Sequence, residues 1–256
     1  MNILMIGDVV GHVGCDHLRR VLPELKRKHA VDICIVNGEN SADGNGITPV
    51  SARHILDSGA DVITGGNHSF RRPEIRAYLD ETPYVLRPHN YPAATTPGTG
   101  VYTVDKGRFR LTVVNLMGVA YMEPLACPFD TLDAVLAAEQ PTCCLVDFHA
   151  EATAEKQALA YYADGRVSAV IGTHTHVQTN DATILPNGTG YLTDVGMTGP
   201  IHSILGVDPA LSIQKMRTKL PVRFAVADGP CKMEGVLLTV DNTTGKTTSI
   251  STVCIK

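Results

Sequence analysis

The sequence predicts an α/β protein in which two packed sheets are covered by outer helices. In the first third of the chain, short apolar runs alternate with segments of helical periodicity, a rhythm typical of a parallel sheet covered by helices. The last third is rich in strand-like runs, which predicts a second sheet. A chain of 256 residues forms one domain more often than two, so we expect a single domain over residues 1–256.

The first third supplies three strands and three helices. Strands are expected at 3–6, 31–36 and 61–64, and helices at 17–29, 51–57 and 73–79. Leu18, Leu22 and Leu25 lie at helical spacing in the first helix. Pro23 conflicts with that spacing, so this helix is expected to kink or to begin late. Pro73 suits the first turn of the third helix.

The remainder of the chain mixes strands and helices. Lys106-Gly107 separates the strand-like runs 101–105 and 108–116, which predicts a β-hairpin. Further strands are expected at 143–148, 167–171, 182–185, 190–193, 222–227, 234–240 and 247–254. Further helices are expected at 132–139, 154–162 and 209–219.

Composition limits the classes of protein. The formal net charge of -4 gives no general attraction to nucleic acid, and no apolar stretch approaches the roughly 20 residues that span a bilayer. The seven cysteines form no CxxC pair, which argues against a disulfide framework or a zinc ribbon. Cys34, Cys143 and Cys144 are expected to be buried thiols, which suits a reducing cytoplasm. Residues 1–6 are expected to form a strand and not a signal peptide, because they lack a basic leader.

Polar side chains follow the ends of the first three predicted strands. Asp8 follows the first strand, and Asn67 and His68 follow the third. Glu39 and Asn40 follow the second. Open α/β sheets bind their ligands at the carboxyl ends of the strands. Oxygen and imidazole groups at such an edge suit borderline-hard divalent metals.

Each of these groups also has an ordinary structural explanation. Asp8 can accept hydrogen bonds from turn amides, and the glycines around it match no phosphate-binding loop motif. Asn40 lies among turn-forming residues, where Asn is expected, whereas Glu39 is less expected in a tight turn. His68 can be a ligand, a general acid or a helix-capping residue. The residues alone leave these alternatives open.

Two histidines one residue apart are the strongest metal signal in the chain. His174 and His176 follow the strand predicted at 167–171, and positions i and i+2 at a strand end point to the same side. Neutral imidazole is the commonest protein metal ligand, so we expect this pair to bind metal, with a polar strand facing solvent as the alternative. His149 follows another apolar run, where a lone histidine is usually part of the core. Surface or turn positions are expected for His12, His17, His29, His54 and His89.

The order of these groups resembles that of the calcineurin-like metallophosphoesterases, in which an Asp motif precedes a loop acid, Gly-Asn-His, a further His and Gly-x-His-x-His. The chain departs from that order because Asp8 lacks the usual histidine two residues later and because its loop acid is Glu39, beside Asn40. The second departure is a signature of the YmdB family of bacterial phosphodiesterases, which the chain resembles over nearly its whole length. Matching segments are Gly7-Asp8-Val9-Val10-Gly11, Asn37-Gly38-Glu39-Asn40, Gly66-Asn67-His68, Asp147-Phe148-His149-Ala150-Glu151-Ala152-Thr153, Gly172-Thr173-His174-Thr175-His176-Val177-Gln178-Thr179, Asp194-Val195-Gly196-Met197-Thr198-Gly199-Pro200 and Leu220-Pro221-Val222-Arg223-Phe224.

The resemblance implies a four-layer α-β-β-α sandwich of two mixed sheets flanked by helices. It also implies two metal ions, iron first and manganese second, bridged by Glu39, with His68 as the catalytic histidine. The first ion would be held by Asp8, Glu39, Asn40 and His176. The second would be held by Glu39, Asn67, His149 and His174.

The implied activity is hydrolysis of a phosphodiester, above all a 2′,3′-cyclic nucleotide, by a metal-bridging hydroxide. The expected partner is a small nucleotide substrate, with no membrane and no strong nucleic-acid signal, and a homo-oligomer is left open. The alternatives are a phosphomonoesterase with the same centre, or a metal-bound regulatory or RNA-associated module with vestigial activity. Arg71, Arg72 and His202 are candidates for substrate contact, and the Trp expected soon after Asn67-His68 is absent.

Overall fold

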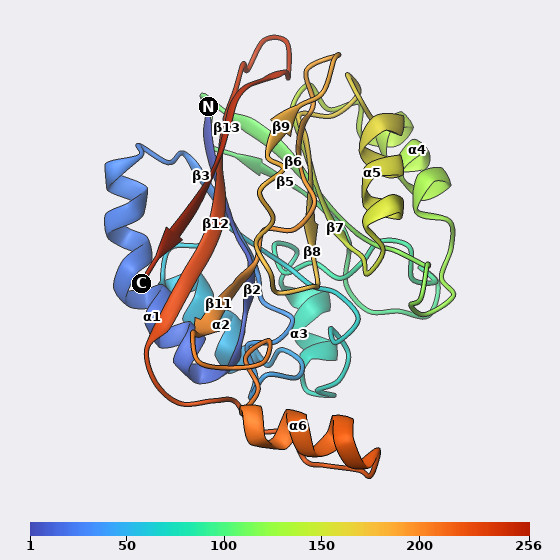
Figure 1. Ribbon diagram of the computed structural model, residues 1–256. Coiled ribbons are helices and arrows are strands. Elements are labelled where there is room, and N and C mark those ends of the chain that lie inside the picture. The colour runs from blue at the N-terminus through green and yellow to red at the C-terminus, as the bar shows by residue number, and fades with distance from the viewer.

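The structure is a computed structural model that describes residues 1–256, and it has four layers, with two mixed sheets in the middle and helices outside them (Figure 1). The first sheet contains β1 (Asn2–Ile6), β2 (Asp8–Val9), β3 (Ile33–Asn37), β4 (Val62–Thr64), β11 (Met197–Pro200), β12 (Cys231–Val240) and β13 (Thr247–Ile255). The second contains β5 (Val101–Asp105), β6 (Arg110–Met117), β7 (Cys144–His149), β8 (Ala169–Thr173), β9 (Thr183–Ile184) and β10 (Gly190–Leu192).

Both sheets combine parallel and antiparallel pairs. In the first, the order is β2-β11-β12-β1-β3-β4 with β13 beside β12, and β1 runs parallel to β3 but antiparallel to β12. In the second, the order is β5-β6-β7-β8-β10-β9, and β6, β7 and β8 are parallel. β5 and β6 form an antiparallel pair, so the predicted hairpin is confirmed.

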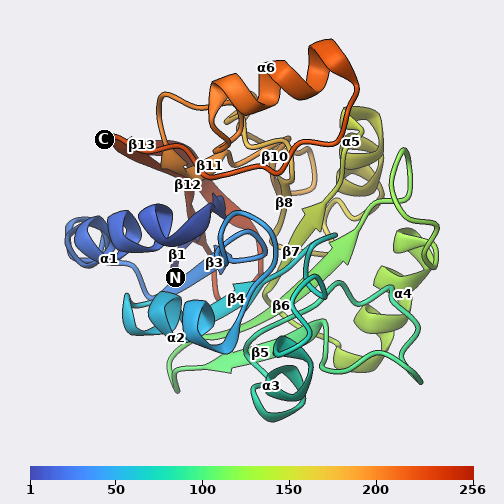
Figure 2. The same cartoon turned by 90° about the horizontal axis from the view of Figure 1, so that it is seen from below.

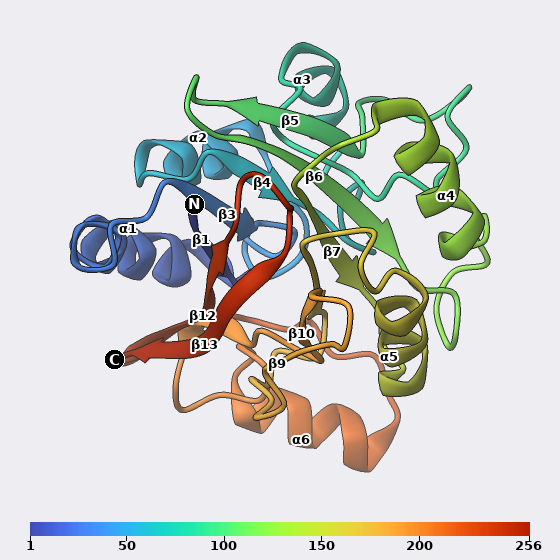
Figure 3. The same ribbon diagram turned by 90° about the horizontal axis from the view of Figure 1, so that it is seen from above.

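Helices cover the outer face of each sheet. The protein has six helices, α1 (Gly11–Lys28), α2 (Pro49–Asp57), α3 (Ile75–Glu81), α4 (Pro128–Glu139), α5 (Thr153–Tyr162) and α6 (Pro209–Thr218). Figures 2 and 3 show α1 and α2 outside the first sheet and α4 and α5 outside the second. α6 lies apart from both sheets. No helix combines the length and the apolar character needed to cross a membrane.

The alternation of side chains along the strands builds three apolar layers. In β1, Ile3 and Met5 point between the sheets and meet Leu145 of β7 in one cluster. Leu4 and Ile6 point the other way, into a cluster shared with α1, α2 and α3. Successive side chains of a strand face opposite sides, so strands covered on both sides need nearly continuous apolar runs. This explains why the predicted buried strands were recognisable in the sequence.

Some sequence-based expectations about the helices and strands are wrong. α1 begins at Gly11 rather than at residue 17 and contains Pro23, which lies on its exposed side. Gly14 lies within this helix and is needed for packing, because a Cβ there would lie 2.5 Å from the Thr198 carbonyl oxygen. His17, expected at the surface, is buried in this helix with 2% exposure. The run 222–227 is not a strand and makes only a bridge between Val226 and Val207.

Two strands escaped prediction. β2 and β11 pair in parallel through Asp8 with Met197 and Val9 with Thr198. A strand of two to four residues is too short to show a period of two in the sequence. These short strands fix Asp8 at the sheet edge.

Candidate metal centre

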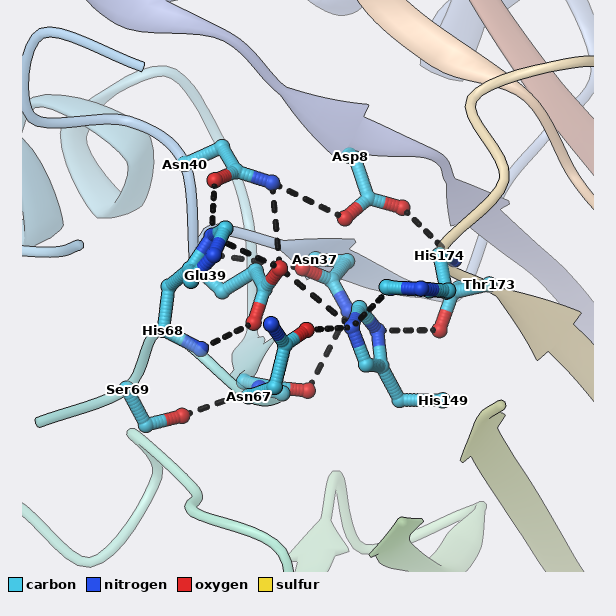
Figure 4. Close-up of polar contacts among 12 residues, drawn as sticks. Asp8, Asn37, Glu39, Asn40, Asn67, His68, Ser69, His149, Thr173 and His174 are labelled. Carbon is cyan, nitrogen blue, oxygen red and sulfur yellow. Dashed lines mark hydrogen bonds and ion pairs between the residues drawn. The ribbon is translucent and has the colours of Figure 1, made fainter. Parts of the chain in front are cut away.

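The side chains expected to bind metal converge where strands of the two sheets end (Figure 4). Asp8 lies in β2, and the first sheet also contributes the loops that follow β3 and β4. His149 is the last residue of β7, and β8 leads into the turn that carries His174 and His176. The site is therefore built by both sheets, and segments far apart in the sequence meet in it.

The ligand candidates form two groups. In the first, Asn40 Nδ2 is 3.4 Å from Asp8 Oδ1 and 3.2 Å from His176 Nε2. In the second, His149 Nε2 is 2.9 Å from Asn67 Oδ1 and 3.1 Å from His174 Nδ1. This division is the one that the family resemblance implies.

Glu39 lies between the two groups. Its Oε1 is 3.1 Å from Asn40 Nδ2 and 3.3 Å from His149 Nε2. Its Oε2 accepts a hydrogen bond of 2.8 Å from the backbone N–H of His68. The carboxylate, only 1% exposed, is thus placed to face both groups at once.

Gly66 permits this close approach. A Cβ on Gly66 would lie 2.3 Å from Glu39 Oε2 and 2.4 Å from His149 Nε2, closer than side-chain atoms can come. Any larger residue would push apart the carboxylate and the imidazole. Gly66, the residue before Asn67, is therefore needed so that Glu39 and His149 of the second group can pack closely together.

His174 and His176 reach the site in a way that differs from the expected strand geometry. β8 ends at Thr173, and both histidines have left-handed backbones, with φ of 104° and 63°. Their side chains therefore do not follow the simple i, i+2 alternation of a strand. His174 joins the second group and His176 the first, so one tight turn serves both halves of the site.

The hydrogen bonds of His149 fix which ring nitrogen carries a proton. Thr173 donates its hydroxyl hydrogen to Asp147 Oδ1 at 2.7 Å, so its oxygen accepts from His149 Nδ1–H at 2.9 Å. Figure 4 shows this contact on the side away from Glu39. In the neutral ring, Nε2 is then a bare lone pair pointing into the cluster.

The other two histidines follow the same pattern. His174 Nε2 lies 3.0 Å from a carboxylate oxygen of Glu151, and His176 Nδ1 lies 3.0 Å from the backbone carbonyl of Leu205. Both acceptors require an N–H, so the remaining nitrogen of each ring faces the site as an acceptor. Metal-binding histidines are typically held in this way, with the second nitrogen bonded to a carboxylate or carbonyl.

The surroundings of His149 Nε2 favour a positive charge at this point of the site. Its neighbours are Asn67 Oδ1, Glu39 Oε1 and the acceptor nitrogen of His174, at 2.9, 3.3 and 3.1 Å. Burial lowers the pKa of His149, but Glu39 and other carboxylates outweigh burial and raise it to about 9. A proton on Nε2 reconciles these acceptors in the metal-free protein, and a metal ion can take its place. The residues present therefore fit a metal centre.

The two carboxylates stay ionised despite their burial. Burial raises the pKa of Asp8, but the neighbouring His176 and His149 more than offset it and hold the pKa below its usual range. Burial also raises the pKa of Glu39, and His149 reverses this effect, so the net shift is downward. Negative charge is thus concentrated where the imidazole acceptors point. The ligand-type atoms of Glu39, His149 and His174 all lie within 4.8 Å of one another.

Asn40 departs from the expected ligand geometry in one respect. Its amide nitrogen faces Asp8, Glu39 and His176, while its oxygen lies 2.8 Å from His68 Nδ1. A metal ligand must present the oxygen, because an amide nitrogen carries no available lone pair. Half a turn of the amide exchanges the two atoms, so ligation by Asn40 requires that rotation.

His68 lies beside the cluster. Its side chain is 29% exposed, and its Nδ1 is 3.5 Å from Glu39 Oε1. Burial lowers the pKa of the His68 imidazole, against the opposing charge of Glu39. The ring therefore favours its neutral form, in which one nitrogen donates and the other accepts.

The three candidates for substrate contact, Arg71, Arg72 and His202, differ in position. Arg72 is bound to the loop after Asn40, where it donates to the carbonyls of Asn45 and Ala42 at 3.1 and 3.2 Å. Arg71 is exposed, and its charge contributes to the lowered pKa of His68. His202 is exposed, and no hydrogen bond or ion pair links it to the cluster.

Several supporting residues had no role assigned from the sequence. Thr173 and Asp147 orient His149, and Asn37 Nδ2 donates to Asp147 Oδ2 at 3.2 Å. Burial raises the pKa of Asp147 to about 6. One signal for Asp147 was available, because residues two apart in a strand share a face and His149 was already a candidate. Nothing in the sequence pointed to the carbonyl of Leu205.

The fold and this site define the class of the protein. A putative 5′-nucleotidase from Staphylococcus aureus shares the fold, with a TM-score of 0.62 at 16% identity over 99% of this chain and 54% of that one. The four layers, with two mixed sheets between outer helices, are the fold of a calcineurin-like metallophosphoesterase, an enzyme that hydrolyses phosphate esters.

Within this class, the protein belongs to a narrower family. The chain matches the YmdB-like protein family over residues 4–253 and belongs to it. It is 47% identical to a 2′,3′-cyclic-nucleotide 2′-phosphodiesterase of Bacillus subtilis, over 100% of this chain and 97% of that protein. A hypothetical protein from Thermus thermophilus has the same structure, with a TM-score of 0.95 at 42% identity over 100% of this chain and 99% of that one. The predicted resemblance is confirmed.

Proposed function

We propose that this enzyme is a phosphodiesterase with two metal ions, iron or manganese, and that its substrate is a cyclic nucleotide, most of all a 2′,3′-cyclic nucleotide. The observation that carries the metal centre is His149 Nε2, which faces three acceptors, Asn67 Oδ1, Glu39 Oε1 and His174 Nδ1, so that a positive charge among them is favoured. The substrate class follows from the Bacillus subtilis relative, whose name states that activity. A single domain and a cytoplasmic location are part of the same proposal.

The two groups of side chains supply the ligands. Asp8, Asn40 and His176 would hold the first ion, and Asn67, His149 and His174 the second. Glu39 would contact both, since its Oε1 already faces both groups. When bound, two such ions clamp the phosphoryl oxygens and make an attacking water acidic. With only two carboxylates among the ligands, the loaded site attracts a phosphodiester anion.

Asn40 and His68 are coupled through one hydrogen bond. In the present orientation, the Asn40 oxygen accepts from His68 Nδ1–H, so Nε2 of the neutral ring lacks a proton. When the Asn40 oxygen turns toward the ligand cluster, its amide nitrogen donates to His68 Nδ1. The neutral ring then carries its proton on Nε2, where it can be directed at the leaving oxygen. Ligation by Asn40 thereby prepares His68 as a donor.

Metal analysis followed by a substrate panel tests this proposal. Protein purified without chelator should hold two iron or manganese ions per chain and hydrolyse 2′,3′-cyclic nucleotides. Removal of the metals should abolish hydrolysis, and their return should restore it. Faster turnover of phosphomonoesters than of diesters would favour the phosphomonoesterase alternative. A metal-loaded protein without turnover on either class would favour the regulatory module.

Arg71, rather than Arg72, is expected to contact the phosphate or the base of the substrate. Arg72 is already bonded to the loop at 42–45, whereas Arg71 is exposed near His68. An exposed charge contact contributes about 0.2–1 kcal/mol, so Arg71→Ala should raise KM by about 1.4- to 5-fold with little change in kcat. High salt should reduce the effect.

Arg76, an exposed arginine of α3, provides the matched control. Arg76→Ala should leave KM unchanged at low and high salt. An unchanged KM in Arg71→Ala at low salt would show that Arg71 is a solvated surface residue that does not contact the substrate.

A further inference from the structure

A buried ion pair lies beneath the turn that carries His174 and His176. Lys156 of α5 places its Nζ 2.9 Å from Asp194 Oδ2, and the two side chains are only 1% and 0% exposed. Removing two charges from water is costly, and replacing a buried pair by apolar residues often leaves stability unchanged or higher. Stability alone is therefore a weak explanation for this pair.

Asp194 connects the lysine to the centre of the histidine turn. Its Oδ2 accepts from the backbone N–H of Thr175 at 2.9 Å, in addition to the lysine. Its Oδ1 accepts from the backbone N–H of Gly196 at 2.9 Å. An ionised carboxylate accepts all three bonds, whereas a protonated one has to donate with one oxygen. Lys156 supplies the positive counter-charge to the Asp194 carboxylate in this buried position.

The turn at His174–His176 needs stabilising contacts such as the bond from Thr175 to Asp194, because its backbone is strained. Left-handed backbones are uncommon for residues other than glycine, and sparsely populated backbone conformations persist only when the surroundings impose them. The flanking bonds are those of His174 N–H to Asp8 Oδ2, at 3.3 Å, and of His176 Nδ1 to Leu205. The bond from Thr175 to Asp194 fixes the residue between them.

Gly172 shows that the lysine passes directly under this turn. A Cβ on Gly172 would lie 2.9 Å from Lys156 Cδ and 1.8 Å from the carbonyl oxygen of Thr193. The aliphatic part of Lys156 thus packs against the end of β8, just before the chain enters the turn. The lysine contributes both packing and charge at that point.

We propose that Lys156 and Asp194 are positioning residues that hold Thr175 so that His174 and His176 reach the two separate halves of the metal centre. The inference rests on the proposed metal centre. Neither residue contacts a reacting atom. They act through the backbone of the turn, and their effect falls on metal binding and kcat rather than on KM.

Variants that separate positioning from simple stability test the proposal. Asp194→Asn should weaken metal binding at least tenfold and lower kcat, with a smaller change in KM. Lys156→Met leaves a lone buried carboxylate and should lower the unfolding temperature. The double variant has no lone charge, so it should regain much of the unfolding temperature but not metal binding or kcat. Lys106→Met is the control. It removes an exposed ion pair, in which Lys106 Nζ lies 2.7 Å from Asp61 Oδ1, and it should change neither metal binding nor kcat.

A double variant that regains metal affinity and kcat together with its unfolding temperature would show a purely structural pair and overturn the proposal. A second measurement needs no variant and no metal. In the metal-free wild-type protein, the Thr175 amide should exchange its hydrogen at least a hundredfold more slowly than an open loop. Exchange at the rate of an open loop would overturn the proposal as well. Failure of the wild type to bind metal or to cleave phosphate esters would instead contradict the proposed function.

Discussion

Replacement of Glu39 with alanine should release one or both metal ions and reduce turnover more than any other single substitution. Glu39 is the side chain placed to contact both groups of ligands, with Oε1 3.1 Å from Asn40 Nδ2 and 3.3 Å from His149 Nε2. Loss of an outer partner of a metal ligand typically costs 10–100-fold in affinity, so loss of a shared ligand should exceed about 100-fold. Metal content after dialysis and kcat on a cyclic nucleotide measure the effect.

The metal-free form of the Glu39→Ala variant offers a second measurement. Glu39 is the main charge that raises the pKa of His149 to about 9, against the opposing effect of burial. Its removal should lower that pKa, which NMR titration of the His149 ring can follow. Glu24→Ala, at an exposed position of α1, is the control and should bind metal like the wild type. Full metal content and near-normal turnover in Glu39→Ala would exclude Glu39 as a bridging ligand.

Replacement of His68 with alanine should leave both metal ions bound and remove most of the turnover. The backbone N–H of His68, which bonds Glu39 Oε2 at 2.8 Å, remains in the variant. What is lost is the ring, whose Nδ1 bonds Asn40 Oδ1 at 2.8 Å and whose Nε2 remains for the substrate. Loss of proton donation should lower kcat by about 10²–10⁴-fold, or about 2.7–5.4 kcal/mol in barrier height.

His12→Ala is the matched control, because His12 is an exposed histidine of α1 that was not a candidate for metal binding or substrate contact. It should retain the metals and the full kcat. Metal analysis and steady-state kinetics on the same preparations distinguish a metal ligand from a proton donor. Loss of metal from His68→Ala would make His68 a ligand instead of a proton donor.

The sequence by itself determined much of the fold. β1, β3 and β7 are covered on both faces, and burial on both faces requires apolar runs that are visible without a structure. Glu39 and Asn67 were candidates because polar groups at strand ends meet at one edge of a sheet, whereas the role of His149 as a ligand was implied by the family resemblance. Short strands such as β2 escaped, since two residues show no period.

Only the tertiary structure decided how the site is arranged. The turn at His174–His176 is bonded to Asp194, which follows it by at least eighteen residues, and Asp194 is paired with Lys156 of α5. No local sequence pattern encodes these contacts. The free nitrogen of each imidazole is set by a partner such as Thr173 or Leu205, which becomes a neighbour only after folding. Residue types are local and chemical, so the sequence reveals them. The direction of a lone pair depends on contacts between distant segments, so it is decided by packing.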